Sequence, residues 1–178
     1  TIHRISLFRE QDRHVIFRLI NMLYFPFRVF LFSLLKKNFD IIMASTAPPV
    51  VVGFSAALSA KITGADFFYH CMDIHPEIGR ISGEFRNPVV FRFMRMMDSF
   101  SCMISKWVIV LSDDMKQSLL ARPGYNQDNI QVINNFSMPH YGDILDVDPK
   151  LLKQSGRFRI IFAGNIGRFQ GLEAFVDA

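Results

Sequence analysis

Short apolar runs alternate with segments of helical pattern along most of this chain, and that alternation restricts the fold more than any other feature. The runs are DIIMAS at 40–45, DFFYHC at 66–71, WVIVL at 107–111, NIQVI at 129–133 and FRIIFAG at 158–164. Runs of this length, bounded by turn residues, are typical of buried strands. Because strands that alternate with helices form parallel sheets, we expect an α/β protein with a doubly wound parallel sheet.

The segments between the runs carry recognisable helix starts and stops. Pro48 and Pro49 precede the small, apolar segment 50–62, and Gly64 follows it as a C-terminal cap. Ser112 is placed to cap a helix whose first turn holds two aspartates, where negative charge suits the helix dipole.

A longer helix is expected from Pro88 to about Lys106. Apolar side chains recur on one face at spacings of three and four, whereas basic and polar side chains share another. The apolar row is Val89, Phe93, Met96, Phe100 and Met103, and the stripe is Arg92, Arg95, Ser99 and Lys106. This pattern predicts an amphipathic helix with a basic outer stripe.

The N-terminal part of the chain combines positive charge with aromatic and aliphatic side chains. Before Asp40, seven basic residues stand against two acidic ones, a balance that favours an anionic surface over a neutral partner. The apolar run 15–35 contains two arginines and is therefore a poor membrane-spanning helix. We expect an amphipathic helix from Arg13 to Lys37, either docked on anionic lipid or merely solvated on its basic side. Nucleic acid is the less favoured partner, because no nucleic-acid-binding module is recognisable.

The stretch YHCMDIHPEIGR at 69–80 gathers two histidines, an aspartate and a glutamate directly after an apolar run. If the strand continued, two carboxylates and one imidazole would alternate onto one side, but Pro76 interrupts that extension. We therefore expect no metal here. Cys71 and Cys102 are too far apart in sequence for a CxxC pair, so packed thiols in a reducing, cytosolic setting are expected.

Polar residues follow the predicted strands at the ends where open α/β sheets bind their ligands. They are STAPP at 45–49, MDIHPE at 72–77, Ser112 and NN at 134–135. Because the carboxyl ends of parallel strands meet at one edge of the sheet, these segments can line a single crevice.

In their order along the chain, the motifs resemble the retaining glycosyltransferases of the GT-B class, in the large family 4 that uses nucleotide-sugar donors. The matching stretches are DIIMASTAPP at 40–49, DFFYHCMDIHPEIG at 66–79, VIVLSDDMK at 108–116, IQVINNF at 130–136 and IIFAGNIGRFQGLE at 160–173. The AGNIG-type turn and the DIHPE-type loop look closest to bacterial enzymes that assemble O-antigen, capsule or exopolysaccharide repeats on a lipid carrier. The resemblance implies an acceptor-side, Rossmann-like domain over 1–135, a linker over 136–157 and the first βα unit of a donor-binding domain over 158–178.

The resemblance also implies parts that these 178 residues do not hold, namely an opening strand with a glycine-rich turn and the paired glutamates that grip the donor. The chain begins without an initiator Met and without an apolar signal segment. We therefore expect an incomplete acceptor domain, a fragment of a longer enzyme that is inactive alone.

For the acceptor side, the resemblance implies that Asp73 is the catalytic carboxylate that orients the acceptor hydroxyl. His75 is the expected imidazole partner, since Met72 stands where the family often has a His. The residues expected to bind the acceptor are Thr46, His70, Glu77, Ser112 and Asn135. The alternatives are that Asp73 and Glu77 only cap their turn and that Ser112 only caps its helix.

For the donor side, the turn GNIGRFQG at 164–171 is expected to bring backbone N–H groups and a helix start near the donor's diphosphate. The expected donor-binding residues are Gly164, Asn165, Gly167 and Arg168. The family often has a basic residue where Asn165 stands and a Lys where Gln170 stands, so Arg168 is the expected substitute.

The implied partners are a nucleotide sugar, expected to be UDP-linked, as donor substrate and a lipid-linked glycan as acceptor, with no cofactor and no metal. Together with the basic N-terminal helix, this predicts a cytoplasmic enzyme, peripheral at the inner face of the plasma membrane, that transfers a hexosyl or N-acetylhexosaminyl group. Two alternatives stay open. One is a non-catalytic remnant that docks on a membrane or a partner, and the other is a sugar-nucleotide epimerase of similar two-domain build.

Overall fold

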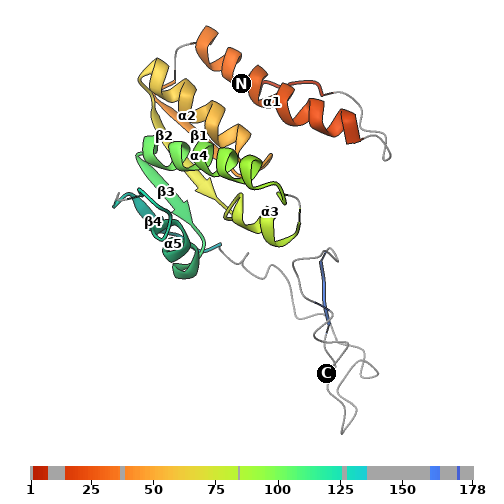
Figure 1. Ribbon diagram of the computed structural model, residues 1–178. Helices are drawn as coiled ribbons and strands as arrows, with labels where there is room; N and C mark the ends of the chain where they lie inside the picture. Colours follow the sequence, from red (N-terminus) through yellow and green to blue (C-terminus); the bar gives the residue numbers. More distant parts are fainter. Residues whose placement is uncertain are drawn as a thin grey trace, which may run out of the picture. The chain divides into compact units, whose positions relative to one another are not determined.

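The computed structural model describes residues 2–7, 15–36, 39–83, 85–125, 128–135, 161–164 and 172 (Figure 1). The chain divides into two compact units, Thr1–Asn134 and Asn135–Ala178, and each is considered by itself. Every helix and strand of the described residues lies in the first unit.

In the described residues of the first unit, four parallel strands form one sheet in the order β1-β2-β3-β4. They are β1 Ile41–Ser45, β2 Asp66–Cys71, β3 Trp107–Val110 and β4 Ile130–Val132. In this register Ser45 is opposite His70, and Cys71 is opposite Val110. The sheet and its alternating helices confirm the predicted α/β, Rossmann-like fold class, and the carboxyl ends of neighbouring strands lie side by side.

Among the described residues the helices are α1 Val15–Lys36, α2 Val51–Thr63, α3 Glu77–Ile81, α4 Pro88–Ile104 and α5 Asp113–Leu120. Local side-chain chemistry sets several of their ends. Ser112 Oγ accepts a hydrogen bond from the backbone N–H of Met115 at 3.3 Å and so caps α5, as predicted. The side chain of Asn87 caps α4 in the same way, accepting from Val89 N at 2.9 Å. Gly64 closes α2 with a φ of 80°, a conformation that favours glycine.

The core of the first unit lies between the helices and one face of the sheet. Its buried members are Ala56, Ala57, Ala60, Phe67, Tyr69, Cys71, Ile74, Cys102, Val108, Val110, Leu119, Tyr125 and Ile130. Helix α2 approaches the Tyr69 ring closely because position 53 is glycine, where an added Cβ would lie 2.6 Å from the ring. Small residues on α2 therefore set how closely that helix packs on β2.

The expected amphipathic helix is present as α4, but the apolar row predicted for it does not face the core. The buried residues of α4 are Phe91, Met94, Asp98, Ser101 and Cys102, on the side opposite the predicted apolar row. Four members of that row, Val89, Phe93, Met96 and Met103, are exposed instead. The inward side is the one that carries Asp98, whose Oδ1 accepts a hydrogen bond from Tyr69 Oη at 2.7 Å. Apolar spacing alone does not reveal this contact.

Helix α1 packs on α2 (Figure 1). Its outward side is also apolar. The exposed row on α1, at spacings of three and four, is Ile20, Leu23, Phe27, Leu31 and Leu35. Asn21 and Ser33, both polar, are buried on other sides of the helix. No helix in the described part of the chain has the length and apolar character needed to cross a bilayer.

In the second unit, residues 161–164 belong to the strand predicted at 158–164. They lie outside any strand and are exposed, so the expected burial is absent in these four residues. The rest of that run, the linker at 136–157 and the start of the following helix lie outside the described residues, apart from residue 172. The prediction of a second Rossmann-like domain therefore stays a prediction.

Candidate functional site

The candidate site is the edge of the sheet at which β1 and β2 end. The backbone N–H of Met72, just after β2, donates a hydrogen bond to Oγ1 of Thr46, just after β1, at 3.3 Å. Thr46 is buried, so its hydroxyl ties the two loops together rather than facing solvent. Two of the strand ends predicted to share a crevice are thus in contact.

Asp73 lies exposed in the loop that follows β2. Its carboxylate makes no hydrogen bond and no ion pair to the residues that the structure describes, so it does not cap its own turn there. Ionised carboxylates are acceptors with several lone-pair sites. Asp73 can therefore accept a hydrogen bond from a ligand hydroxyl at this edge of the sheet.

The two histidines of the motif differ in their surroundings. Nδ1 of His75 is buried and has no hydrogen-bond partner within the described ranges. Buried nitrogens without a partner are uncommon in native proteins, and a water or a ligand can satisfy one. His70 is half-buried in β2, on the face opposite Tyr69 because successive strand residues alternate. Neither imidazole is hydrogen-bonded to Asp73 in the described part of the chain.

Glu77, the first residue of α3, binds Arg122 at two points. Arg122 Nε donates to Oε1 at 3.0 Å, and Nη2 donates to Oε2 at 2.7 Å. The same Nη2 donates to the backbone oxygen of His75 at 2.6 Å. Two-point pairing of a guanidinium with a carboxylate fixes direction as well as distance. Arg122 therefore holds the loop on both sides of Pro76, and Glu77 positions the loop that carries Asp73.

Arg122 also reaches into the core. Its Nη1 donates to Oδ2 of Asp98 at 2.6 Å, while Tyr69 Oη donates to the other carboxylate oxygen at 2.7 Å. Burial raises the pKa of the Asp98 carboxyl, against the opposing pull of Arg122 and Tyr69. Burial, reinforced by Asp98, likewise raises the pKa of the Tyr69 phenol well above its ordinary value. For Arg122, burial lowers the pKa, but Asp98 and Glu77 outweigh it and the guanidinium stays charged.

Sequence reasoning missed Arg122 and Asp98. Asp98 is the one acidic residue between Pro88 and Ile104, and acids are almost never fully buried unless they are paired. A single acidic residue on the helix therefore indicates that, if it is buried, a cation elsewhere in the protein pairs with it. This signal does not identify Arg122 as that cation, because Arg122 follows α5 and no sequence motif around it indicates burial.

Cys71 and Cys102 are free, buried thiols beside this network. Hydrogen bonding to Cys71, together with burial and the nearby Asp98, raises the pKa of the Cys102 thiol well above its ordinary value. Since the thiolate is the reactive form, Cys102 is inert, in keeping with the expected packing role.

The remaining predicted residues lie in other segments of the chain, and Ser112 follows β3, the strand that pairs with β2. Ser112 uses its hydroxyl as the cap of α5. Asn135 is the first residue of the second unit, which is considered by itself. Of the donor-side residues, Gly164 is described, whereas Asn165, Gly167 and Arg168 lie outside the described residues. Among the residues the structure describes, no group of three or more His, Cys, Asp and Glu side chains could hold a metal ion.

Polar loops at the carboxyl ends of parallel strands are the ligand-binding architecture of Rossmann-like α/β proteins. The chain belongs to glycosyltransferase family 4, of the GT-B type, since the model of that family, Glycosyltransferase Family 4, matches residues 5–136 of the 178. Membership implies the binding of a nucleotide sugar. Comparisons with curated proteins and with solved structures gave no match.

Proposed function

We propose that this chain supplies the acceptor side of a retaining glycosyltransferase. The enzyme moves a hexosyl or N-acetylhexosaminyl group from a UDP-linked sugar to a lipid-linked glycan in polysaccharide assembly. Family membership over residues 5–136 supports the reaction class. The observation that carries the assignment of the site is Asp73, an exposed carboxylate without a partner in the described residues, on a loop anchored to the core through Glu77 and Arg122.

The proposed chemistry is a front-face displacement. The acceptor oxygen bonds to the anomeric carbon on the face from which the diphosphate leaves, and a diphosphate oxygen takes the acceptor proton. The protein's part is to orient the hydroxyl and to stabilise positive charge that develops at the sugar carbon. Asp73 accepts the hydroxyl's hydrogen bond, and its negative charge favours the transition state.

The other assignments follow from position. His75 is proposed to hold the sugar or relay a proton, with His70 behind it. Acceptor-binding roles are proposed for Thr46, Glu77, Ser112 and Asn135, and donor-binding roles for Gly164, Asn165, Gly167 and Arg168. Because Thr46 and Glu77 are already hydrogen-bonded within the protein, we propose that they act chiefly by shaping the loops.

The test of the reaction uses the protein expressed from its native reading frame. It is incubated with UDP-linked hexoses and N-acetylhexosamines and with a lipid-diphosphate glycan, and product is followed by mass spectrometry. We expect transfer from at least one donor, with NMR showing the donor's anomeric configuration retained. Inversion of that configuration would contradict the proposal. So would hydrolysis of the donor at the same rate with and without the lipid-linked glycan.

We further propose that the protein works at the cytoplasmic face of the plasma membrane, docked through α1. The exposed row on α1 supplies apolar contact, and Arg28 and Lys36 lie exposed on the same helix. Helices that combine an apolar face with basic side chains lie in the interface of anionic bilayers.

The docking is tested by sedimentation with vesicles of phosphatidylglycerol or of phosphatidylcholine. We expect binding to the anionic vesicles that weakens with salt, since surface attraction is screened within about 10 Å at 0.1 M salt. Phe27→Gln should weaken it, whereas Ile62→Gln, an equally exposed apolar position on α2, should not. Equal binding to both lipids would contradict the electrostatic part of the proposal.

A further inference from the structure

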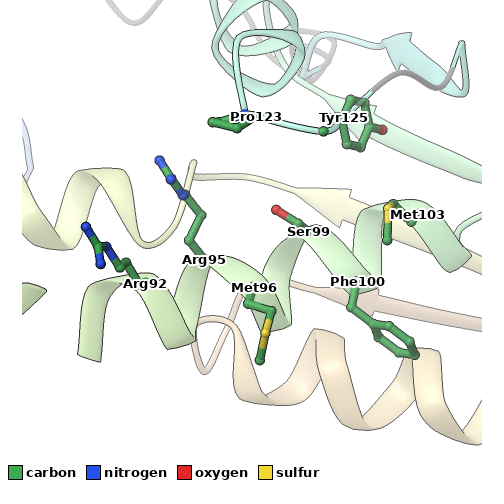
Figure 2. A pocket seen from close by; sticks show the side chains of 9 residues that line it. Arg92, Arg95, Met96, Ser99, Phe100, Met103, Pro123 and Tyr125 are labelled. Atoms are coloured by element: carbon green, nitrogen blue, oxygen red, sulfur yellow. The ribbon is translucent and has the colours of Figure 1, made fainter. Parts of the chain in front are cut away.

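A groove of about 450 Å³ lies between α4 and the turn that follows α5 (Figure 2). Its lining includes Arg92, Arg95, Ser99, Met103, Pro123 and Tyr125. None of these residues belongs to the loops at the carboxyl edge of the sheet, so the groove is separate from the site proposed for sugar transfer. Its volume is in the range of small-molecule sites.

One end of the groove is cationic. Figure 2 shows Arg92 and Arg95 one turn apart on α4, with Arg95 reaching toward Pro123. Within the described ranges, no carboxylate lies within 4.0 Å of either guanidinium, and the one interaction found for the pair is Arg95 over the Phe91 ring at 5.4 Å. Two neighbouring guanidiniums without an acid suit a phosphate group, which accepts their N–H donors in pairs.

The other end of the groove is apolar and rigidly built. Met103 projects from α4 toward the turn that carries Pro123 and Tyr125, and Ser99 lies between Met103 and the arginines (Figure 2). Tyr125 is buried, and its hydroxyl donates to Oδ1 of Asn129 at 2.7 Å. The turn starts next to Arg122, which is anchored in the core. The far wall is therefore preformed rather than assembled on binding.

The surface around the groove is apolar as well. Val89 is 72% exposed, Phe93 55% and Met96 62%, all on the outward side of α4 next to Arg92. Apolar surface of this kind on a monomeric protein marks an interaction site. A free phosphate would use the arginines alone. Only a ligand with both a phosphate and a hydrocarbon chain uses the two ends of the groove together.

We propose that this groove binds one anionic phospholipid of the membrane, with its phosphate on Arg92 and Arg95 and the start of an acyl chain along Met103 and Tyr125. The phosphate also receives a hydrogen bond from Ser99. The charge of the arginines selects the headgroup, and the exposed side of α4 rests on the surrounding lipid. Binding in the groove is independent of sugar transfer, so the two proposals can fail separately.

The experiment measures binding of dihexanoyl phosphatidic acid, a water-soluble probe with phosphate and short chains, to the 178-residue chain by calorimetry. Inorganic phosphate and the uncharged dihexanoyl glycerol are measured beside it. Because both guanidiniums bind the phosphate, Arg92→Gln with Arg95→Gln should weaken binding about tenfold or more. Lys116→Gln removes a charge on α5 outside the groove and should leave binding unchanged. Thermal melting confirms that each variant is folded.

A second pair of variants tests the apolar end. Met103→Gln should weaken binding of the lipid severalfold without changing the weak binding of inorganic phosphate, and Ile62→Gln should change neither. Phosphate that binds as tightly as the lipid, or lipid binding that survives loss of both arginines, would overturn the proposal. Light scattering measures whether the chain forms a dimer. If it does, and if Met103→Gln dissociates that dimer, this face is a contact between two copies of the chain, and the lipid proposal is overturned.

Discussion

Arg122 Nη1 lies 2.6 Å from Oδ2 of Asp98, and each of the two side chains is only 2% exposed. From the same guanidinium, Nε and Nη2 reach Glu77 at the start of α3. One buried cation thereby joins the turn after α5, the middle of α4 and the loop after β2. The loop that carries Asp73 is therefore tied to the core through Arg122.

Replacing Arg122 by Met should destabilise the fold severely. The variant leaves the buried Asp98 and the partly buried Glu77 without their cation, and breaking a buried pair in this way typically costs about 3–5 kcal/mol. Urea unfolding measures the loss. Lys106→Met is the matched control, because it breaks the exposed pair with Asp66 and should cost at most about 1 kcal/mol. Similar losses in the two variants would mean that burial does not matter here.

From the raised pKa of the Tyr69 phenol we predict how the stability of the fold changes at alkaline pH. The pKa of this phenol in the folded chain lies well above the ordinary value of 10.0, chiefly because of burial. Above pH 10 the unfolded chain releases this proton and the folded chain keeps it, so the free energy of unfolding falls as pH rises. The contribution is fully present below pH 10 and is lost toward the raised pKa.

Tyr69→Phe isolates that contribution. The variant should lose about 1–3 kcal/mol at neutral pH, because Asp98 loses a hydrogen bond in the core. Above pH 10 its free energy of unfolding should fall less steeply than that of the wild type, by up to about 1.4 kcal/mol per pH unit. Urea unfolding at several pH values measures both slopes, and equal slopes would show that Tyr69 ionises normally in the folded chain.

Gly53→Ala should destabilise the packing of α2 on β2. The added methyl would lie 2.6 Å from the Tyr69 ring, which is fully buried and held by Asp98. Overpacking of this kind costs about 1–3 kcal/mol. A double-mutant cycle with Tyr69→Leu checks the cause, since the cost should shrink once the ring is absent. A cost that stays the same in the Tyr69→Leu background would assign it to another contact.

Glu77→Gln should lower the stability and the turnover of the enzyme together. The change removes the charge that Arg122 meets at two points, and hydrogen bonds to charged groups are worth about 1.5–3 kcal/mol. Because Glu77 positions the loop, we expect a lower kcat with a melting temperature that falls in parallel. A variant that loses turnover at an unchanged melting temperature would place Glu77 on the substrate instead.

Local pattern predicted much of this fold because strand and helix signals are local. The apolar runs gave four strands at their observed places, and Ser112 caps α5 as its position indicated. The orientation of α4 could not be predicted in the same way. Apolar side chains occur on both sides of that helix. The inward side carries Asp98, whose partners Tyr69 and Arg122 are distant in the sequence.

The candidate site was only partly visible in the sequence. The motif at 72–77 and its place after β2 could be read directly, because strand ends bind ligands in this class of fold. The separate roles of the residues within the motif could not be read from the sequence. Asp73 and Glu77 are chemically alike and four residues apart, and only the position of Arg122 shows that Glu77 is engaged with the core while Asp73 is exposed.

The most direct test of the account is the transfer rate of Asp73→Asn, measured in the protein expressed from its native reading frame with donor and lipid-linked acceptor. The substitution keeps the shape of the side chain and removes its charge. We expect transfer to fall by about a hundredfold or more, with the melting temperature unchanged. Asp114→Asn, at an exposed carboxylate in the first turn of α5, should keep wild-type activity. An Asp73→Asn protein that melts and transfers sugar like the wild type would contradict the account.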